Sequence, residues 1–498
     1  MPQPNPVRVR FAPSPTGHTH LASGRTALYN YLLARQTGGK FILRIEDTDQ
    51  KRYVPGAEKE LMDSLHWLGI DWDEGPNVGG PNGPYYQTQR KDIYQEYARM
   101  LINSGHAYYC FCTSERLAKV HKEQVSRKEN PRYDGLCRQL DPSEAQIRAV
   151  AGERYVVRFK VPDVGSVTAY DVLRGDITVD HSALDDSIIV RSDGLALYHL
   201  AAMVDDQLMG ITHVIRGSEW LSTFPLHVLI IRAFGWQEPQ WVHLSLFRKP
   251  DGKGKMSKRD ISQALLDGYS IFIKDLEGLG YIPEGVVNWI ALMGWSYDDH
   301  TEFFEMKDLI EKFNLEHLNP SPAAINFTKF DYFNGLHIRN LSRDDLAHRL
   351  EPYITSAGYR LDKDILYRAV PIIRERLVTL DDIIPVAGFL FKDVITPNPQ
   401  ELVGDKLTPV ESAKIARETY QILKALPEIN KEMAEPPLRE LVERSGLKAG
   451  QVFGIVRVAV TGQKVSPPLF ESIEIIGKDK VLKRIQSAAE ILEKMQNP

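Results

Sequence analysis

Residues 7–39 read VRVRFAPSPTGHTHLASGRTALYNYLLARQTGG, and this stretch decides the expected fold. Residues 7–11 alternate in side-chain character as a β-strand does, and residues 13–20 form a loop rich in Pro and Gly. Residues 24–36 then carry apolar side chains at helical spacing, up to the stop signal Gly38-Gly39. A strand, a loop and a helix in this order indicate the start of an α/β domain.

The remaining chain extends this pattern and then departs from it twice. Residues 41–45 (FILRI) form a second expected strand, and helical patterns follow, so we predict a parallel sheet of the Rossmann-like kind. From residue 108 to about 186 short alternating strands and a cysteine cluster indicate an inserted α+β domain. The strand and helix pattern then resumes, and beyond about residue 330 nearly every segment has helical spacing, which predicts an all-α C-terminal region.

Composition limits the class of protein. A chain of 498 residues suggests about three domains or more, at a prior of roughly 150 residues each. No run of about 18 apolar residues predicts a membrane span, and the N-terminal residues lack the apolar segment of a signal peptide. Three cysteines are too few for a disulfide framework. We therefore expect a cytoplasmic protein that does not enter a membrane.

A cationic loop is expected at residues 248–259, RKPDGKGKMSKR. It carries six basic side chains against the single acid Asp251, and it follows a predicted strand at residues 242–247. A charge run is usually a solvated surface. The loop at residues 13–20, however, opens a helix whose free N–H groups and positive end suit a phosphate. Together the two loops indicate a nucleotide site.

The motifs resemble those of one enzyme family. PSPTGHTHLASG is similar to the HIGH signature of class I aminoacyl-tRNA synthetases, and KMSKR at residues 255–259 is similar to their KMSKS signature. With RFAPSPTG and RIEDTD, they resemble the bacterial-type glutamyl-tRNA synthetases. Further stretches that match this family are YVPGAE, LGIDWDEGP, YYQTQR, PRYDG, LYHLAAMVDD and THVIRGSEW.

This resemblance implies a function and a set of partners. We expect a ligase that activates L-glutamate with ATP and Mg²⁺ to glutamyl-adenylate and transfers the glutamyl group to the 3′ end of tRNA-Glu. The motifs leave tRNA-Gln open as a second acceptor, and we expect the protein to be a monomer. The implied domains are a catalytic domain in two halves, an inserted acceptor-binding domain, a stem-contact region and a helical anticodon-binding region. Their expected bounds are 1–107 and 187–259 for the catalytic halves, 108–186 for the insertion, 260–330 for the stem-contact region and 331–498 for the anticodon-binding region.

The resemblance also assigns the ATP site. Adenylation mainly requires that charge on phosphoryl oxygens be stabilised, so the expected catalytic residues are hydrogen-bond donors and cations: His20, Lys255 and Lys258. The other implied ATP contacts are Pro13, Ser14, Thr16, Gly17, Ser23, Gly24, Trp220, Met256, Ser257 and Arg259. One departure concerns Ala22 and Ser23, where relatives usually have smaller residues. Their extra atoms predict weaker ATP binding.

Glutamate needs cations for its two carboxylates and an anion for its ammonium group. The positions that match the family's pocket are Arg10, Ser14, Glu46, Tyr198 and Arg216. By the resemblance, Arg10 and Arg216 bind carboxylates and Glu46 binds the amine. Arg8 alternates with Arg10 along the strand, so we expect it to face the other side.

Two further sites are implied. Cys110, Cys112 and Cys137 offer three thiolates, and tetrahedral zinc needs a fourth ligand. Some relatives have His where this chain has Gln139, whereas others use a Tyr that corresponds to Tyr133. A structural zinc ion on these four residues and a trio of free thiols are the two interpretations. Arg374 and Arg376 correspond to the position at which relatives inspect the anticodon.

Three rival functions follow from the same motifs. A short paralogue that glutamylates a tRNA base lacks an anticodon-binding part, which residues 331–498 of this chain supply. A glutaminyl-tRNA synthetase has a β-rich anticodon region, which these residues do not suggest. A catalytically impaired tRNA-binding paralogue is motivated by Ala22-Ser23, but His20 and Lys258 are both present.

Overall fold

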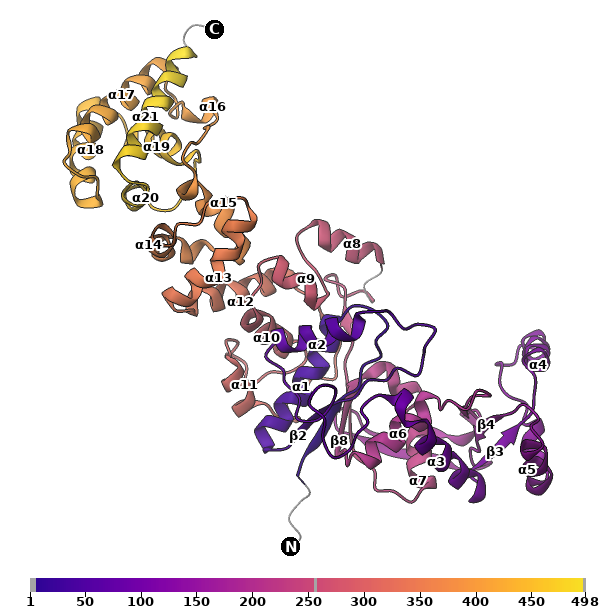
Figure 1. Ribbon diagram of the computed structural model, residues 1–498. Helices are drawn as coiled ribbons and strands as arrows, with labels where there is room; N and C mark the ends of the chain where they lie inside the picture. The colour runs from indigo at the N-terminus through magenta and orange to yellow at the C-terminus, as the bar shows by residue number, and fades with distance from the viewer. Residues whose placement is uncertain (1–5, 255–257, 496–498) are drawn as a thin grey trace. The chain divides into compact units, whose positions relative to one another are not determined.

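The computed structural model describes residues 6–254 and 258–495. The chain forms two compact units (Figure 1). Unit 1 contains the residues up to Leu276 together with Val286–Phe327, and unit 2 contains Glu277–Gly285 and the residues from Thr328 onward. The mixed α/β class and the helical C-terminal region agree with the sequence prediction.

Parallel strands form the centre of unit 1. Strand β1 (Arg8–Phe11) pairs with β2 (Lys40–Leu43), and β8 (His213–Gly217) pairs with β9 (Gln240–Leu244), both in parallel. Strands β1 and β8 are also neighbours, because the backbone N–H of Thr212 donates to the carbonyl oxygen of Arg8 at 2.9 Å (Figure 1). The carboxyl ends of β1 and β8 thus lie at one edge of the sheet, where α/β proteins bind ligands.

Helix α1 (Leu21–Thr37) follows β1, as the sequence predicts, but it begins three residues earlier than the expected start. The earlier start has a physical cause: His20 caps the helix, since its Nδ1 accepts a hydrogen bond from the N–H of Ala22 at 3.2 Å. Gly38 ends the helix with a left-handed φ of 65°.

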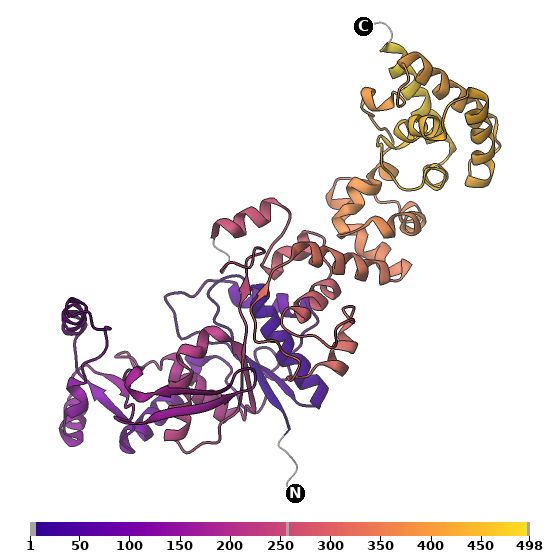
Figure 2. The same cartoon turned by 180° about the vertical axis from the view of Figure 1, so that it is seen from behind.

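Strands in and next to the segment predicted as an insertion form a separate antiparallel sheet in the order β3-β4-β7. A hairpin within this segment joins a different sheet, in the order β6-β5-β9-β8. Strand β5 (Ser166–Asp171) pairs with β6 (Gly175–Asp180) and also, in parallel, with β9, where Asp171 lies opposite Trp241. Figure 2 gives the view of these strands from behind. Asp171 is thereby brought into the sheet that carries the site described below. The three strands of the separate sheet are β3 (Ala107–Cys110), β4 (Val156–Phe159) and β7 (Ile188–Val190).

Helices cover the sheets of unit 1. Helix α7 (Phe224–Ala233) is buried over most of its length, and α6 (Tyr198–Leu208) is buried from Leu200 to Asp206, so both belong to the core. The other helices and short strands of this part are α2 (Ala57–Trp67), α3 (Lys91–Asn103), α4 (Ser114–Ser126), α5 (Pro142–Val150), β10 (Phe247–Arg248), α8 (Lys258–Leu266), α9 (Ile273–Gly278), α10 (Pro283–Leu292), α11 (Met306–Lys312) and β11 (Ala323–Ala324). Helix α12 (Phe327–Asn340) lies in unit 2 except for its first residue.

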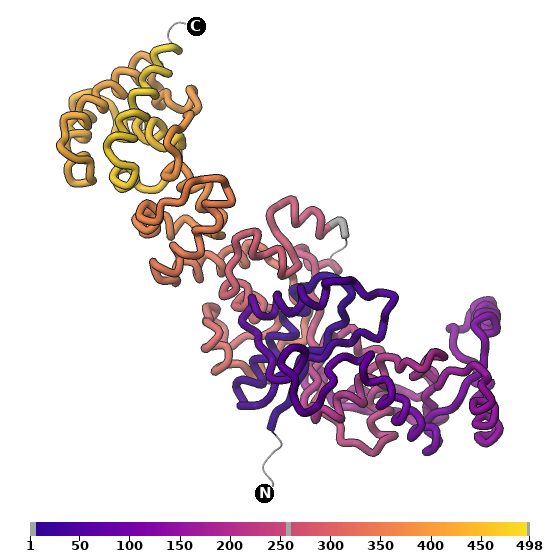
Figure 3. Tube along the Cα trace, in the orientation of Figure 1, coloured from indigo at the N-terminus to yellow at the C-terminus, as the bar shows by residue number. Residues whose placement is uncertain are grey.

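Unit 2 is helical throughout its described residues, as the tube in Figure 3 shows. Its helices enclose a continuous core of Leu, Ile, Val, Ala and Phe side chains. These helices are α13 (Arg343–Ser356), α14 (Lys363–Ile373), α15 (Ile383–Ala387), α16 (Pro399–Leu402), α17 (Pro409–Ala425), α18 (Lys431–Ser445), α19 (Ala449–Thr461), α20 (Leu469–Ile476) and α21 (Lys478–Lys494). Within the described part of the chain, every helix is too short or too polar to cross a bilayer.

Candidate active site

A cavity of about 540 Å³ opens in unit 1 at the carboxyl ends of β1 and β8 and the N-terminus of α1. It brings together ten of the residues that the sequence assigned to ATP or glutamate: Arg10, Pro13, Ser14, Thr16, His20, Ser23, Glu46, Tyr198, Arg216 and Trp220. Ala22, the other member of the unusual pair, also lines the cavity. Segments separated by about 200 residues in sequence thus share one pocket.

Several assigned residues are not among those that line the cavity. Gly17 is exposed in the loop before α1. At Gly24 an added Cβ would lie 2.7 Å from Cδ1 of Ile273, so the absence of a side chain lets α9 pack closely on α1. Residues 255–257, which include Lys255, Met256 and Ser257, lie outside the described residues. Lys258 and Arg259 begin α8, and their side chains also lie outside the description.

His20 is held as a neutral hydrogen-bond donor. Its Nδ1 accepts the Ala22 N–H that caps α1, so the ring proton resides on Nε2. Burial lowers the pKa of His20 to about 4, which keeps the ring neutral near pH 7. Its edge also packs against Phe272, with ring centroids 5.9 Å apart. This ring can donate one hydrogen bond from Nε2 to a phosphoryl oxygen.

Arg10 is paired within the protein. Its Nε and Nη2 donate to the two carboxylate oxygens of Asp206 at 3.0 and 3.3 Å, and both side chains are buried. Asp206 also accepts from Nη1 of Arg44 at 2.7 Å, and Nη2 of Arg44 donates to Glu46 at 3.0 Å. Burial opposes the ionisation of Asp206, but the charges of Arg10 and Arg44 hold its pKa below the usual range. The floor of the pocket is therefore an ion-pair cluster.

A third carboxylate completes this cluster. Asp205 accepts from Nε of Arg90 at 2.7 Å and lies 3.6 Å from Nε of Arg44. The hydroxyl of Tyr94 donates to the same carboxylate at 2.8 Å. The cluster thus contains three arginines, at positions 10, 44 and 90, and three carboxylates, at positions 46, 205 and 206. Its formal charges cancel.

Arg216 differs from these arginines in its partners. Its guanidinium donates to Nε2 of His243 at 3.0 Å and to Nδ1 of His227 at 3.0 Å. It also donates to the hydroxyl of Tyr198 at 3.3 Å and lies 5.1 Å from the ring centroid of Trp241. No described carboxylate forms an ion pair with it. Arg216 therefore gives the cavity a buried positive charge that the protein leaves uncompensated.

Aromatic rings shape the wall near Arg216. Trp220 stacks on Tyr198 with centroids 4.0 Å apart and an angle of 25° between the planes. Both rings line the cavity, and neither is fully buried. The exposed part of Trp220 offers a flat apolar surface to a ligand.

Several residues of the site were not assigned from the sequence. Arg44 lies in the quoted motif RIEDTD, and Asp206 lies in LYHLAAMVDD. Two adjacent acids, Asp205 and Asp206, on an otherwise apolar helix indicate buried carboxylates that need cationic partners. His227, His243 and Asp171 carried no local signal. Arg8, expected to face away, contacts Glu74 at 2.8 Å and does not line the cavity, which confirms that expectation.

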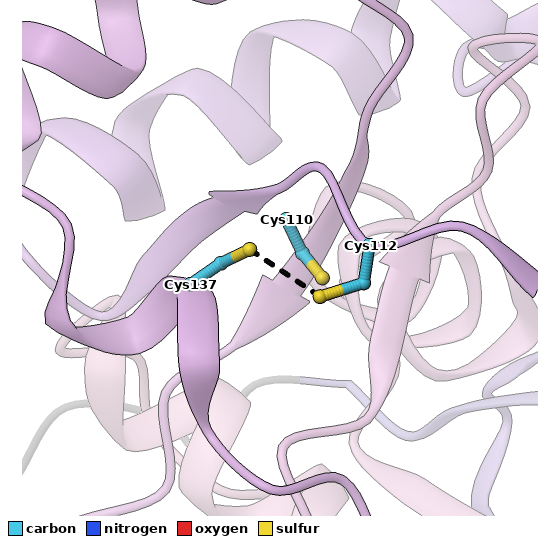
Figure 4. A group of neighbouring side chains, drawn as sticks. All are labelled: Cys110, Cys112 and Cys137. Atoms are coloured by element: carbon cyan, nitrogen blue, oxygen red, sulfur yellow. Dashed lines mark hydrogen bonds between the residues drawn. The ribbon is translucent and has the colours of Figure 1, made fainter. Parts of the chain in front are cut away.

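The three cysteines converge in the segment that the sequence predicts as an insertion (Figure 4). Sγ of Cys112 lies 3.5 Å from Sγ of Cys137, the dashed line in the figure, and all three sulfur atoms lie within 4.8 Å of one another. The hydroxyl of Tyr133 is 3.5 Å from Sγ of Cys110 and 3.7 Å from Sγ of Cys112. Gln139, in contrast, is exposed. Three sulfur atoms and one hydroxyl oxygen therefore lie close together.

In unit 2 the two arginines assigned to the anticodon differ in their surroundings. Arg374 is half-buried and donates from Nη1 to the carbonyl oxygen of Arg339 at 3.3 Å. Arg376 is exposed, and its charge lowers the pKa of Arg457 after the larger effect of burial. Arg376 therefore presents its guanidinium to solvent near another cation.

Known proteins are similar to this chain over nearly its full length. The family model of the catalytic domain of tRNA synthetases class I (E and Q) matches residues 6–332, and that of an anticodon binding domain matches residues 345–489. The chain is 43% identical over 489 residues to a glutamate–tRNA ligase of Dehalococcoides mccartyi, with 97% of this chain and 98% of the relative covered. It is 44% identical over 493 residues to that of Borreliella burgdorferi, with 98% and 99% covered.

A solved structure is similar as well. The crystal structure of a glutamate tRNA ligase from Elizabethkingia meningosepticum in complex with its amino acid has a TM-score of 0.90 to this chain at 34% identity, with 97% of this chain and 99% of that chain covered. The agreement of catalytic part, anticodon part and overall fold shows that this chain belongs to the glutamate–tRNA ligase family of class I tRNA synthetases.

Proposed function

We propose that the protein is a glutamate–tRNA ligase that uses the cavity of unit 1 for both of its chemical steps. In the first step a carboxylate oxygen of glutamate attacks the α-phosphorus of ATP, supplied as its magnesium complex, and pyrophosphate leaves. In the second step a ribose hydroxyl at the 3′ end of the tRNA attacks the acyl carbon, loses its proton, and AMP leaves. Both steps need positioning and charge stabilisation rather than a nucleophilic side chain.

The observation that carries this proposal is the uncompensated charge of Arg216 in the same cavity as Glu46. A buried guanidinium without a carboxylate partner favours an anionic ligand, because burial alone lowers its pKa and disfavours the charged form. The side-chain carboxylate of glutamate supplies the missing charge. Glu46 keeps one carboxylate oxygen beyond its bond to Arg44 and faces the cavity, where it would accept a hydrogen bond from the substrate's ammonium group.

ATP would occupy the end of the cavity near α1. The positive end of this helix would favour phosphoryl oxygens, and the Nε2–H of His20 would donate a hydrogen bond to one of them. Lys255 and Lys258 of the cationic loop would neutralise the leaving pyrophosphate. Ala22 and Ser23 line the cavity and bring additional atoms to this end.

The tRNA would contact both units. We assign the 3′ end to the inserted segment at residues 108–186, the acceptor stem to residues 260–330 and the anticodon to the helices of residues 331–498. Exposed Arg376 is the better placed of the two assigned arginines for a base, since Arg374 already donates to a backbone carbonyl. We also propose that the protein acts as a monomer in the cytoplasm, which size-exclusion chromatography with light scattering and cell fractionation would test.

The experiment that tests the function is aminoacylation. The purified protein is incubated with ATP, with tRNA-Glu or tRNA-Gln, and with radiolabelled glutamate or, separately, glutamine. We expect glutamate to be attached to tRNA-Glu, and glutamine not to be, because a neutral amide leaves Arg216 unpaired at a cost of several kcal/mol. Equal charging with glutamine would contradict the pocket assignment, and no charging of any tRNA would favour the impaired paralogue.

We propose in addition that Cys110, Cys112, Tyr133 and Cys137 hold a structural zinc ion that takes no part in the reaction. The converging sulfur atoms support this, as do Nε of Arg158 and Nη1 of Arg116, which each donate to a sulfur at 3.4 Å and so favour thiolates. When bound, zinc would fix the fold of the inserted segment. Elemental analysis of chelator-free protein should give about one zinc per chain.

Tyr133→Phe tests the fourth ligand, because it keeps the ring and removes only the hydroxyl. If Tyr133 is a ligand, this variant should bind zinc more weakly than the unaltered chain in a competition with a chromophoric chelator. A zinc content near zero in the unaltered chain would instead leave the cysteines as free thiols.

A further inference from the structure

Arg216 is held by neutral groups alone, and two of them are histidines that the sequence did not single out. His227 and His243 are each fully buried. His227 comes from α7 and His243 from β9, so the two rings reach the guanidinium from different elements. A carboxylate in place of either histidine would also accept a hydrogen bond from Arg216, but it would cancel the charge of the guanidinium.

We propose that His227 and His243 are positioning residues that hold Arg216 through neutral acceptors, so that its charge remains available to the substrate's side-chain carboxylate and sets the preference for glutamate over glutamine. This inference rests on the proposed function. It concerns how the pocket distinguishes two amino acids that differ in charge but hardly in shape.

The directions of the hydrogen bonds follow from the chemistry of arginine, which can only donate. Nε2 of His243 must therefore accept from Arg216, and its Nδ1–H donates to the carboxylate of Asp171 at 2.8 Å. Nδ1 of His227 must accept as well, and its Nε2–H donates to Nδ1 of His199 at 2.9 Å. Each ring is thus fixed in one neutral tautomer by a partner on its far side.

Protonation of either ring would place an N–H against an N–H of Arg216. Burial lowers the pKa of His227 well below its usual value, and the charge of Arg216 lowers it further. Burial likewise lowers the pKa of His243 to about 4, although the hydrogen bond to Asp171 opposes this shift. Both rings are therefore neutral at physiological pH.

Arg10 shows what the alternative looks like in the same cavity. Its guanidinium is bound by both oxygens of Asp206, and that pair carries no net charge. Of the two arginines assigned to the glutamate carboxylates, Arg10 thus has a built-in counter-ion and Arg216 does not. A ligand carboxylate gains more from the second, because no resident anion competes for it.

The test replaces His227 with two residues that differ only in charge. In both Asn and Asp an oxygen takes the place of Nδ1, so His227→Asn keeps a neutral acceptor for Arg216, whereas His227→Asp adds a counter-ion of the same shape. Aminoacylation of tRNA-Glu is measured for the full-length protein at saturating ATP and tRNA, with glutamate varied and glutamine as a competing inhibitor.

We expect His227→Asp to raise the KM for glutamate on the order of 10²-fold above that of His227→Asn. The KM for ATP should be similar in the two variants, and the ratio of the glutamine Ki to the glutamate KM should fall in His227→Asp only. A merely structural role would change both variants alike. Equal KM values for glutamate in two folded variants would overturn the proposal, whereas failure of the unaltered chain to charge glutamate would overturn the proposed function itself.

A second measurement reports the protonation of the two rings directly. In the unaltered chain labelled with ¹⁵N-histidine, Nδ1 of His227 and Nε2 of His243 should give the signals of unprotonated ring nitrogens throughout pH 6–8, with assignment by His227→Asn and His243→Gln spectra. An imidazolium signal from either ring in this range would refute the proposal that Arg216 is held by neutral histidines.

Discussion

Asp206→Asn should be the most damaging single change to the floor of the pocket. It keeps the shape of the side chain but removes the charge that Arg10 contacts at 3.0 Å and Arg44 at 2.7 Å. Three buried arginines would then share two carboxylates. Removal of one partner from a buried ion pair costs about 3–5 kcal/mol, because a charge stays buried without compensation.

The expected loss can be measured as a shift in Tm. For a unit of this size 1 kcal/mol corresponds to about 2 °C, so the unfolding transition of unit 1 should move down by about 6–10 °C in differential scanning calorimetry. Asp63→Asn is the matched control, because Asp63 pairs with Lys59 on the surface of α2 and both side chains are largely exposed. Its Tm should be unchanged.

A double variant tests the reason as well as the size of the effect. Arg10→Met combined with Asp206→Asn removes one cation and one anion, so the cluster is again balanced, and the Tm should fall by less than the sum of the two single changes. Additive losses, or a shift below about 2 °C for Asp206→Asn alone, would show that charge balance does not stabilise this site.

Three further outcomes are expected. Lys258→Ala should lower glutamate-dependent pyrophosphate exchange, measured with tRNA present, by on the order of 10² to 10³ with tRNA affinity retained; exchange at the level of the unaltered chain would contradict the role of the loop. The pKa of His243 is about 4 in the folded state and about 6.5 in the unfolded state, so the unfolded state binds more protons below pH 6.5. A change from pH 7.5 to 5 should therefore lower the free energy of unfolding by about 2 kcal/mol through this residue. His243→Gln should show a smaller fall in Tm between these pH values. Arg376→Ala should raise the KM for tRNA several-fold with the KM for glutamate unchanged, whereas an equal change in both would contradict an anticodon role.

Local sequence patterns predicted the helices and strands named below, but they did not predict pairing between distant segments. The strand, loop and helix at residues 7–39 are present, and so is the helical region beyond residue 330. Each of these depends on side-chain periodicity within one segment. The pairing of β5 with β9 could not be predicted, because it involves a single parallel residue pair, Asp171 and Trp241, between distant segments.

The same limit applies to the site. Arg10 and Arg216 were identified by motifs that surround each of them, and both line the cavity. Which of the two arginines has a carboxylate partner could not be predicted, because the residues that decide this are Asp206, His227 and His243. Asp206 is 196 residues from Arg10 in sequence, and nothing in its own motif shows which cation it meets.

The ion-pair cluster also imposes an order on synthesis. Arg10, Arg44 and Arg90 leave the ribosome long before Asp205 and Asp206, which follow Arg10 by 196 residues and Arg90 by 115. Until that acidic pair emerges, the early strands carry cations that cannot be buried at acceptable cost. A nascent chain that stops short of residue 205 should therefore remain sensitive to protease over residues 7–104, and protection should arise as one event once helix α6 is available to dock.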